Sequence, residues 1–155
     1  MVKVADESVD LRRGIDHIGI TVCFIIHDGN GHILLHKRGA GARDENGRWD
    51  IGGGALEFGE TIDSAVRREI KEEFCCTAKN IQFITAYEAF RKHQDSDTHW
   101  IALVHCVQVD PKEVRIGEPD KIEELGWFTS DTLPSPLHSQ FEKSFNAVKH
   151  LGLIK

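Results

Sequence analysis

The stretch GALEFGETIDSAVRREIKEEFCC, residues 54–76, joins a glycine-containing loop to an acidic helix. Thr61 is a favourable N-cap, and Asp63 suits the positive end of the helix dipole. Steps of about 100° per residue gather the apolar side chains into one stripe. The members of this stripe are Ile62, Val66, Ile70 and Phe74. The pattern predicts a helix from Thr61 to about Phe74 with this stripe against a core.

Three glutamates line the margin of the stripe, namely Glu69, Glu72 and Glu73. Carboxylates spaced three and four residues apart repel one another, and they lose solvation at a buried margin unless protons or cations compensate them. Hard divalent cations bind such oxygens well. Taken alone, the run from Arg68 to Glu73 is also typical of an ordinary solvated helix face.

The flanking sequence predicts strands and a second helix. Apolar segments 18–27 and 32–38 surround Asp28–Gly31, which is typical of a β-hairpin turn. Residues 39–59 form a long glycine-rich loop, and 91–99 a polar turn. Further strands are expected at 49–51, 81–90, 100–109 and 124–128, and an amphipathic helix at 140–151 that Gly152 ends. Strands that are apolar on both faces need cover on both sides, so we expect an α/β fold with one mixed sheet between helices, in a single domain spanning 1–155.

Composition excludes several classes of function. Nineteen basic against 25 acidic residues give a formal net charge of −6, which argues against a long nucleic-acid partner. The apolar run Ile18–Ile26 is too short to span a membrane, and Met1–Asp16 lacks the apolar core of a secretion signal. We therefore expect a cytoplasmic protein. Its four cysteines contain no CxxC pair and its histidines are scattered, so reduced thiols are expected and a Cys/His metal site is not.

The spacing of the glycine, glutamate and arginine residues in this stretch resembles the signature of the Nudix (MutT-like) hydrolase family. Gly54 is followed after five residues by Glu60, and after seven more by Arg68-Glu69-Ile70-Lys71-Glu72-Glu73. Segments 34–38, 49–51 and 126–128 also look like the family. The resemblance implies a Nudix-type α/β/α sandwich with a central mixed sheet.

Two positions depart from the family pattern. Gly52 stands where many members have proline, which alters loop stiffness more than chemistry. Cys75 and Cys76 stand where the pattern has glycine and an aliphatic residue. Cysteine lacks the freedom of glycine in the left-handed region, so we expect the helix end to be rearranged or strained by about 1 kcal/mol or more.

By resemblance, the acidic helix binds Mg²⁺, with Mn²⁺ as a substitute. Glu69 and Glu73 are implied as the principal ligands, Glu72 as a further ligand, and the carbonyl of Gly53 or Gly54 as an additional one. The metal would orient the diphosphate and activate the attacking water.

The resemblance also assigns supporting roles. Arg68 is implied to orient a carboxylate, although a surface ion pair would give the same sequence. Glu60 is expected to hold the loop on the helix, and Glu57 fits either role. In several family members a glutamate before the last strand acts as the catalytic base, and Glu118 is the first choice here. Glu123 and Glu124 are more readily explained as solvent-facing.

Substrate contacts are less well defined by the sequence. Arg38 and Arg43 flank the loop and are the best-placed cations for phosphate, but solvated surface arginines are common. Phe90, Trp100 and Trp127 are candidates for base recognition, and each is equally explained as core.

The resemblance implies a small nucleotide substrate, with a nucleoside or deoxynucleoside triphosphate as first choice, cleaved to a monophosphate and pyrophosphate. The ADP-ribose subclass has a proline soon after the motif, whereas the first proline here is Pro111; the dinucleoside polyphosphate subclass has a tyrosine there, whereas the only tyrosine is Tyr87. An ADP-ribose or nucleotide-sugar pyrophosphatase and a non-catalytic nucleotide-binding regulator stay as alternatives. A homodimer also stays open.

Overall fold

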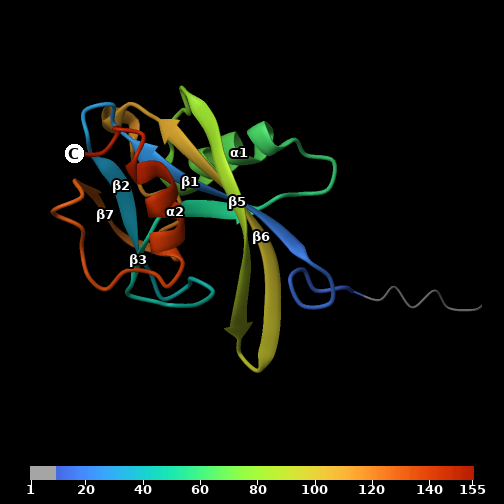
Figure 1. Ribbon diagram of the computed structural model, residues 1–155. Helices are drawn as coiled ribbons and strands as arrows, with labels where there is room; N and C mark the ends of the chain where they lie inside the picture. The colour runs from blue at the N-terminus through green and yellow to red at the C-terminus, as the bar shows by residue number, and fades with distance from the viewer. Residues whose placement is uncertain (1–9) are drawn as a thin grey trace, which may run out of the picture.

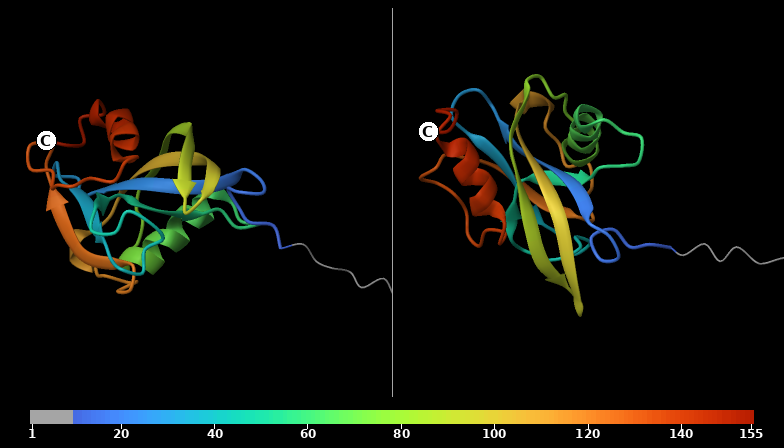
Figure 2. Two further views of the ribbon diagram at one scale, coloured as in Figure 1. Left: turned by 90° about the horizontal axis from the view of Figure 1, so that it is seen from below. Right: turned by 45° about the vertical axis from the view of Figure 1, so that its right-hand side comes forward.

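A computed structural model of the protein describes residues 10–155, and two helices lie on opposite faces of one seven-stranded mixed sheet (Figures 1 and 2). The strands are β1 (Gly19–His27), β2 (Ile33–Arg38), β3 (Trp49–Asp50), β4 (Gly52–Ala55), β5 (Ile81–His93), β6 (Ser96–Gln108) and β7 (Ile122–Phe128). The helices are α1 (Ile62–Phe74), α2 (Phe141–Lys149) and the short 3₁₀ helix η1 (Pro111–Glu113). The expected α/β fold with a central mixed sheet is confirmed.

Strand β1 is the centre of the sheet. It pairs antiparallel with β2 and β4, and parallel with β6, in the order β3-β2-β1-β6-β5, while β7 pairs with β2. Cys23 of β1 lies opposite Gly53 of β4, and Thr21 lies opposite Ala55 on one side and Ala102 on the other. The strand therefore joins the glycine segment directly to the long β5–β6 hairpin.

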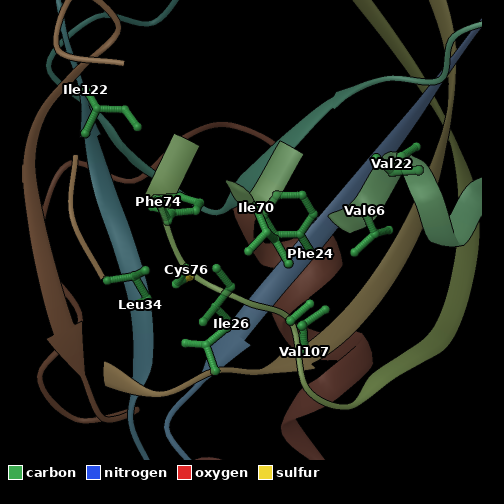
Figure 3. Packing of buried hydrophobic residues seen from close by; sticks show 13 residues of the cluster. Val22, Phe24, Ile26, Leu34, Val66, Ile70, Phe74, Cys76, Val107 and Ile122 are labelled. Carbon is green, nitrogen blue, oxygen red and sulfur yellow. The ribbon is translucent and has the colours of Figure 1, made fainter. Parts of the chain in front are cut away.

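Each helix covers its own hydrophobic cluster. Val22, Phe24 and Ile26 of β1 pack against the helix stripe of α1, formed by Val66, Ile70 and Phe74 (Figure 3). The prediction that Ile62 also belongs to this buried stripe is wrong, because Ile62 lies in the first turn of the helix and is 41% exposed. Against α2 lies a second cluster, formed by Ile25, Ile33, Leu35, Trp49, Ile51, Cys106, Phe141, Phe145 and Val148. Burial of each large aliphatic or aromatic side chain contributes about 1.5–3 kcal/mol, so both helices are held by packing on the sheet.

The first hairpin has the predicted turn. Oδ1 of Asp28 accepts hydrogen bonds from the backbone N–H groups of Asn30 at 2.7 Å and His32 at 3.1 Å. Gly29 and Gly31 have positive φ angles of 79° and 103°, which glycine adopts without strain.

The prediction of a polar turn over 91–99 is wrong. Strand β5 continues to His93, and β6 already begins at Ser96, with Arg91 opposite Thr98 and Lys92 opposite Asp97. This end of the hairpin extends beyond β1, which pairs with β6 only from Trp100 onward, and it projects from the body of the protein (Figure 1). Its residues are polar, and even the inward-facing Arg91 and Thr98 are polar, so the sequence looked like a turn although it pairs as strands.

Several other boundaries shift. Residues 52–55, expected to be loop, form β4; β7 begins two residues before the predicted strand, and α2 is shorter than the predicted 140–151. Beyond α2, Gly152 has a φ of 71°, as expected of a stop signal. Glycine has low β propensity, so only pairing with β1 makes 52–55 a strand.

The helix end at Cys75 has the expected unfavourable geometry. Cys75 has a φ of 56°, and its N–H donates to the carbonyl of Lys71 at 3.1 Å. The helix ends as it would with glycine, at the cost of a left-handed non-glycine residue.

All four cysteines are free, as expected. Within residues 10–155, no helix is long and apolar enough to span a membrane. The expectation about a secretion signal in Met1–Asp16 falls mostly on residues 1–9, outside the described part.

Candidate active site

The acidic helix begins as the sequence predicts. Oγ1 of Thr61 accepts a hydrogen bond from the N–H of Ser64 at 3.1 Å, which caps the first turn. Val66, Ile70 and Phe74 are fully buried or nearly so against the sheet (Figure 3). With this stripe fixed, Glu73 lies beside Gly53 of β4 and Glu69 beside Gly54, whereas Glu72 is half exposed.

Glu73 is the most buried of these carboxylates, with 9% of its surface exposed. The backbone N–H of Gly53 donates to its Oε2 at 3.1 Å. Burial raises the pKa of Glu73 well above its usual value, and the charge of Glu69 raises it further. Glu73 is therefore a desolvated carboxylate in need of a positive partner.

Glu69 lies directly over Gly54. A Cβ atom placed on Gly54 would be 2.1 Å from the carboxyl carbon of Glu69, so any larger residue would displace this carboxylate. Burial raises the pKa of Glu69, opposed by the hydrogen bond from Arg68. The glycine in the motif thus makes room for the carboxylate of Glu69.

Arg68 donates hydrogen bonds both to the motif loop and to α1. Its guanidinium donates to Glu60 at 2.8 and 2.9 Å, to Glu69 at 2.6 Å, to Glu72 at 3.3 Å and to the carbonyl of Ala55 at 3.1 Å. These bonds fix the orientation of Glu69 and hold the loop on α1. Such geometry supports the expected orienting roles of Arg68 and Glu60.

Glu57 pairs with Arg13 at 2.6 Å and does not line the acidic cleft, so its role is structural. Arg13 belongs to the N-terminal turn before β1. The pair links that turn to the motif loop on the protein surface.

The loop before β7 brings Glu118 to the acidic helix. The N–H of Gly117 donates to the carbonyl of Glu73 at 2.9 Å, and Glu118 lines the same cleft as Glu69, Glu72 and Glu73. Oε1 of Glu118 pairs with Nζ of Lys121 at 2.9 Å. The family resemblance indicated a glutamate before the last strand, and the segment between Gly117 and Pro119, which has no apolar periodicity, favoured Glu118. The structure brings Glu118 beside the motif.

The other two acids near β7 lie outside this cleft. Glu123 and Glu124 are exposed, and Glu123 pairs with Lys37 at 3.0 Å. Their expected solvent-facing role is confirmed.

The two candidate phosphate-binding arginines differ. Arg38 is largely enclosed and donates to Asp44 at 3.0 Å, to the Asp44 carbonyl at 2.8 Å and to Asp50 at 3.3 Å. The guanidinium of Arg43 lies 5.4 Å from the centroid of the Trp100 ring, and its ion pair with Asp44 is longer, at 3.8 Å. Both line the acidic cleft, but Arg43 has more freedom to bind an anion.

A second cavity of about 300 Å³ adjoins the acidic cleft. Both hollows are lined by Gly53, Gly54, Arg43 and Glu73, so they are continuous. Trp100 lines this cavity. Phe90, in contrast, is 71% exposed and packs against the ring of His99, and Trp127 packs against the hydrophobic cluster under α1. Of the three aromatic candidates, the geometry therefore favours Trp100.

An ion-pair network lies behind this cavity, and no sequence pattern predicted it. Oε2 of Glu45 lies 2.6 Å from Nε2 of His138 and 2.8 Å from Arg91, while Asp44 lies 3.0 Å from both Arg91 and Arg38. Asp44, Glu45 and His138 are close enough to bind a metal ion. Because the arginines already neutralise the carboxylates, we interpret the group as an ion-pair network that fixes the loop 39–48. Its members are up to 94 residues apart, and no local pattern predicts their contact.

Comparison with known proteins agrees with the fold and identifies the family. Residues 17–148 match the sequence profile of the NUDIX domain family. An oxidized purine nucleoside triphosphate hydrolase of Danio rerio is 31% identical over 119 residues, which cover 74% of this chain and 68% of that protein. An ADP-ribose pyrophosphatase of Methanocaldococcus jannaschii is 30% identical over 118 residues, covering 76% of this chain and 66% of that protein.

A solved structure is similar over most of its length. The MutT NUDIX hydrolase of Burkholderia pseudomallei is 30% identical, with a TM-score of 0.75, and the match covers 85% of this chain and 98% of that one. The chain belongs to the NUDIX hydrolase family.

Proposed function

We propose that this protein is a magnesium-dependent hydrolase that cleaves the phosphoanhydride linkage of a nucleoside or deoxynucleoside triphosphate, releasing a monophosphate and pyrophosphate. The observation that carries the proposal is the continuity of the acidic cleft with the 300 Å³ cavity through Gly53, Gly54 and Arg43. The acidic cleft offers carboxylate oxygens that can bind a metal ion, which in turn would bind the phosphates. The cavity has the size and the aromatic wall that suit a nucleobase.

The residues of the cleft fit a hard divalent cation. Glu69 and Glu73 are desolvated carboxylates near one another, and Glu72 is half exposed at 51% beside them. The N–H of Gly53 points toward Glu73, and in an extended strand the carbonyl of the same residue points in the same direction. The carbonyl of Gly54, in contrast, already accepts a hydrogen bond from the hydroxyl of Thr21 at 2.9 Å. We therefore prefer Gly53 over Gly54 as the additional ligand. Bound Mg²⁺ or Mn²⁺ would neutralise phosphate charge and acidify the attacking water.

The remaining residues act around that centre. Glu118 is placed to accept a proton from the attacking water, and Arg68 keeps Glu69 in its ligating orientation. Arg43, at the junction of the two hollows, is placed to contact a phosphate, with Arg38 holding the loop that carries it.

A triphosphate is favoured over ADP-ribose for two reasons. The Danio rerio relative is named for nucleoside triphosphates, and this chain lacks the proline that marks the ADP-ribose subclass soon after the motif. The Methanocaldococcus jannaschii relative has nearly the same identity, so the substrate must be decided by assay.

The test is a panel of nucleoside triphosphates, oxidised guanine nucleotides, ADP-ribose, NADH and dinucleoside polyphosphates, assayed with Mg²⁺ and with chelator. We expect triphosphates to have the highest kcat/KM and chelation to abolish turnover. A clear preference for ADP-ribose would contradict the substrate class. Tight nucleotide binding without turnover would instead favour a non-catalytic regulator.

A further inference from the structure

Lys121 reaches into the acidic cleft from the turn before β7, and of the described residues that line this cleft it is the only lysine. Its Nζ lies 2.9 Å from Oε1 of Glu118, three residues earlier in the chain. The side chain of Lys121 is 58% exposed and that of Glu118 30%. An exposed ion pair at this spacing contributes little to stability by itself, so any role of the pair must come from its surroundings.

The surroundings of Glu118 are negatively charged, since Glu69, Glu72 and Glu73 line the same cleft. Burial is the largest cause of the raised pKa values of Glu69 and Glu73, and the charge of Glu118 raises both further. The carboxylates therefore repel one another, and Glu118, on a surface turn, can relieve this repulsion by rotating into solvent. The hydrogen bond with Glu118 is also the main cause of a raised pKa of Lys121, so the lysine carries its charge at neutral pH.

The other cations of the site are engaged elsewhere. Arg68 donates to the motif loop and to the glutamates of α1, and Arg38 and Arg43 pair with aspartates. Within residues 10–155, the ammonium group of Lys121 is the only cation that forms an ion pair with Glu118. It is thus the one described group that opposes the repulsion of Glu118 from the cleft.

The main chain of Lys121 is held in place on two sides. Its N–H donates to the carbonyl of Glu118 at 3.0 Å, and its carbonyl accepts from the N–H of Gly39 at 2.7 Å. The N–H of Gly41 donates to the carbonyl of Asp120 at 2.7 Å, and a Cβ on Gly41 would lie 2.6 Å from that oxygen. Because this turn is clamped between two segments, only side-chain rotations are needed to form the ion pair.

We infer that Lys121 is a positioning residue, whose ammonium group holds the carboxylate of Glu118 in the acidic cleft through Oε1 and leaves Oε2 to accept a proton from the attacking water. The inference rests on the proposed function, in which Glu118 is the base. An ionised carboxylate has two accepting oxygens, and within residues 10–155 Oε2 of Glu118 has no hydrogen-bond donor. Lys121 therefore acts on the reaction through Glu118.

The first test is Lys121→Met, which keeps the length of the side chain and removes its charge at an exposed position, so the fold should be retained. We expect kcat at saturating Mg²⁺ to fall roughly tenfold to a hundredfold, as for a misplaced catalytic group, with KM nearly unchanged. Lys121→Arg keeps the cation and should restore most of kcat. A higher KM at unchanged kcat would overturn the inference, because it would assign the ammonium group to substrate binding.

A double-mutant cycle tests whether Lys121 acts through Glu118. Once Glu118→Gln has removed the base, adding Lys121→Met should change kcat by no more than about twofold. A further loss as large as that of Lys121→Met alone would place its action elsewhere.

The matched control is Lys37→Met. Lys37 pairs with Glu123 at 3.0 Å, and neither residue lines the acidic cleft. The control should leave kcat and KM unchanged. If it lowers kcat as much as Lys121→Met does, the effect is one of net charge and the inference fails.

Failure of the proposed function would look different. If the wild type prefers ADP-ribose, only the substrate class is wrong, and the same variants are assayed with ADP-ribose. Wild-type turnover by Glu118→Gln would refute the inference together with the base, while metal-dependent hydrolysis would stand.

If no substrate is turned over, crystal structures of the wild type and Lys121→Met decide. A Glu118 carboxylate that lies in the cleft in the wild type and turns into solvent in the variant would support the positioning role. A carboxylate in the same place in both structures would refute it.

Discussion

The N–H of Gly53 donates to Oε2 of Glu73 across 3.1 Å and connects β4 to the last turn of α1, 20 residues further along the chain. The bond aims the most buried carboxylate of the motif at the glycine segment. It also fixes the direction of the Gly53 peptide, so the strand and the helix present their oxygens to one cleft.

Removing the charge of either principal carboxylate should abolish most turnover. For Glu73→Gln and Glu69→Gln we expect kcat to fall at least about a thousandfold with the fold retained, because each loses a metal-ligating oxygen. Glu72→Gln should lose less, since Glu72 is more exposed. Kinetics at saturating Mg²⁺, with exposed Glu142→Gln on α2 as control, measures this. Near-normal turnover in either of the first two variants would remove the metal assignment.

Glu118→Gln tests the proposed base. A general base contributes about a hundredfold to ten-thousandfold in rate, so kcat should fall by that factor while substrate affinity is nearly unchanged. Glu123→Gln is the matched control, because Glu123 lies five residues further along, at the start of β7, and pairs with Lys37 outside the cleft. Loss of turnover in the control, with wild-type behaviour of Glu118→Gln, would place the base elsewhere.

Cys75→Gly should stabilise the protein. The residue has a φ of 56°, where a non-glycine side chain costs about 1–2 kcal/mol, while glycine adds about 0.4–1 kcal/mol of unfolded-state entropy. We expect a net gain of about 0.5–1 kcal/mol in the free energy of unfolding, measured with urea. Cys75→Ala retains the backbone strain and should show no such gain; an equal gain in both variants would mean that the thiol, not the backbone, is unfavourable.

His36 should make the folded state sensitive to acid. Burial, together with the charges of Arg38 and His138, lowers the pKa of His36 to about 3. Between about pH 6.5 and 3 the unfolded chain therefore binds a proton that the folded protein does not, so stability is present above this window and is lost as pH falls, by up to about 1.4 kcal/mol per unit. His36→Gln should reduce this slope. Identical slopes for both proteins would show that His36 is protonated in the fold.

The sequence predicted those parts of the site that follow a local rule. The stripe of Val66, Ile70 and Phe74 and the cap at Thr61 depend only on helix periodicity and capping, and both are confirmed. From the wheel alone, Glu69 and Glu73 were already placed at the buried margin.

What the sequence could not predict depends on contacts between distant segments. The bond of Glu45 to His138 joins residues with no shared periodicity, and the enclosure of Arg38 depends on a loop that folds back on it. The strand at 52–55 exists because β1 pairs with it, although its glycines have little preference for strands.

The pairing of β1 has a consequence for which molecules the proposed enzyme could process. Thr21 has Ala55, beside the metal-side cleft, on one edge and Ala102, in the floor of the base-side cavity, on the other. Neighbouring strands lie about 4.8 Å apart, so Ala55, which lines both hollows, and Ala102, which lines only the larger cavity beyond the cleft, are separated by roughly two strand spacings that hydrogen bonds keep constant. If the proposed function is correct, this constant spacing selects the bond that is cut, because a longer or shorter spacer between base and anhydride would bring the wrong phosphorus atom to the acidic cleft.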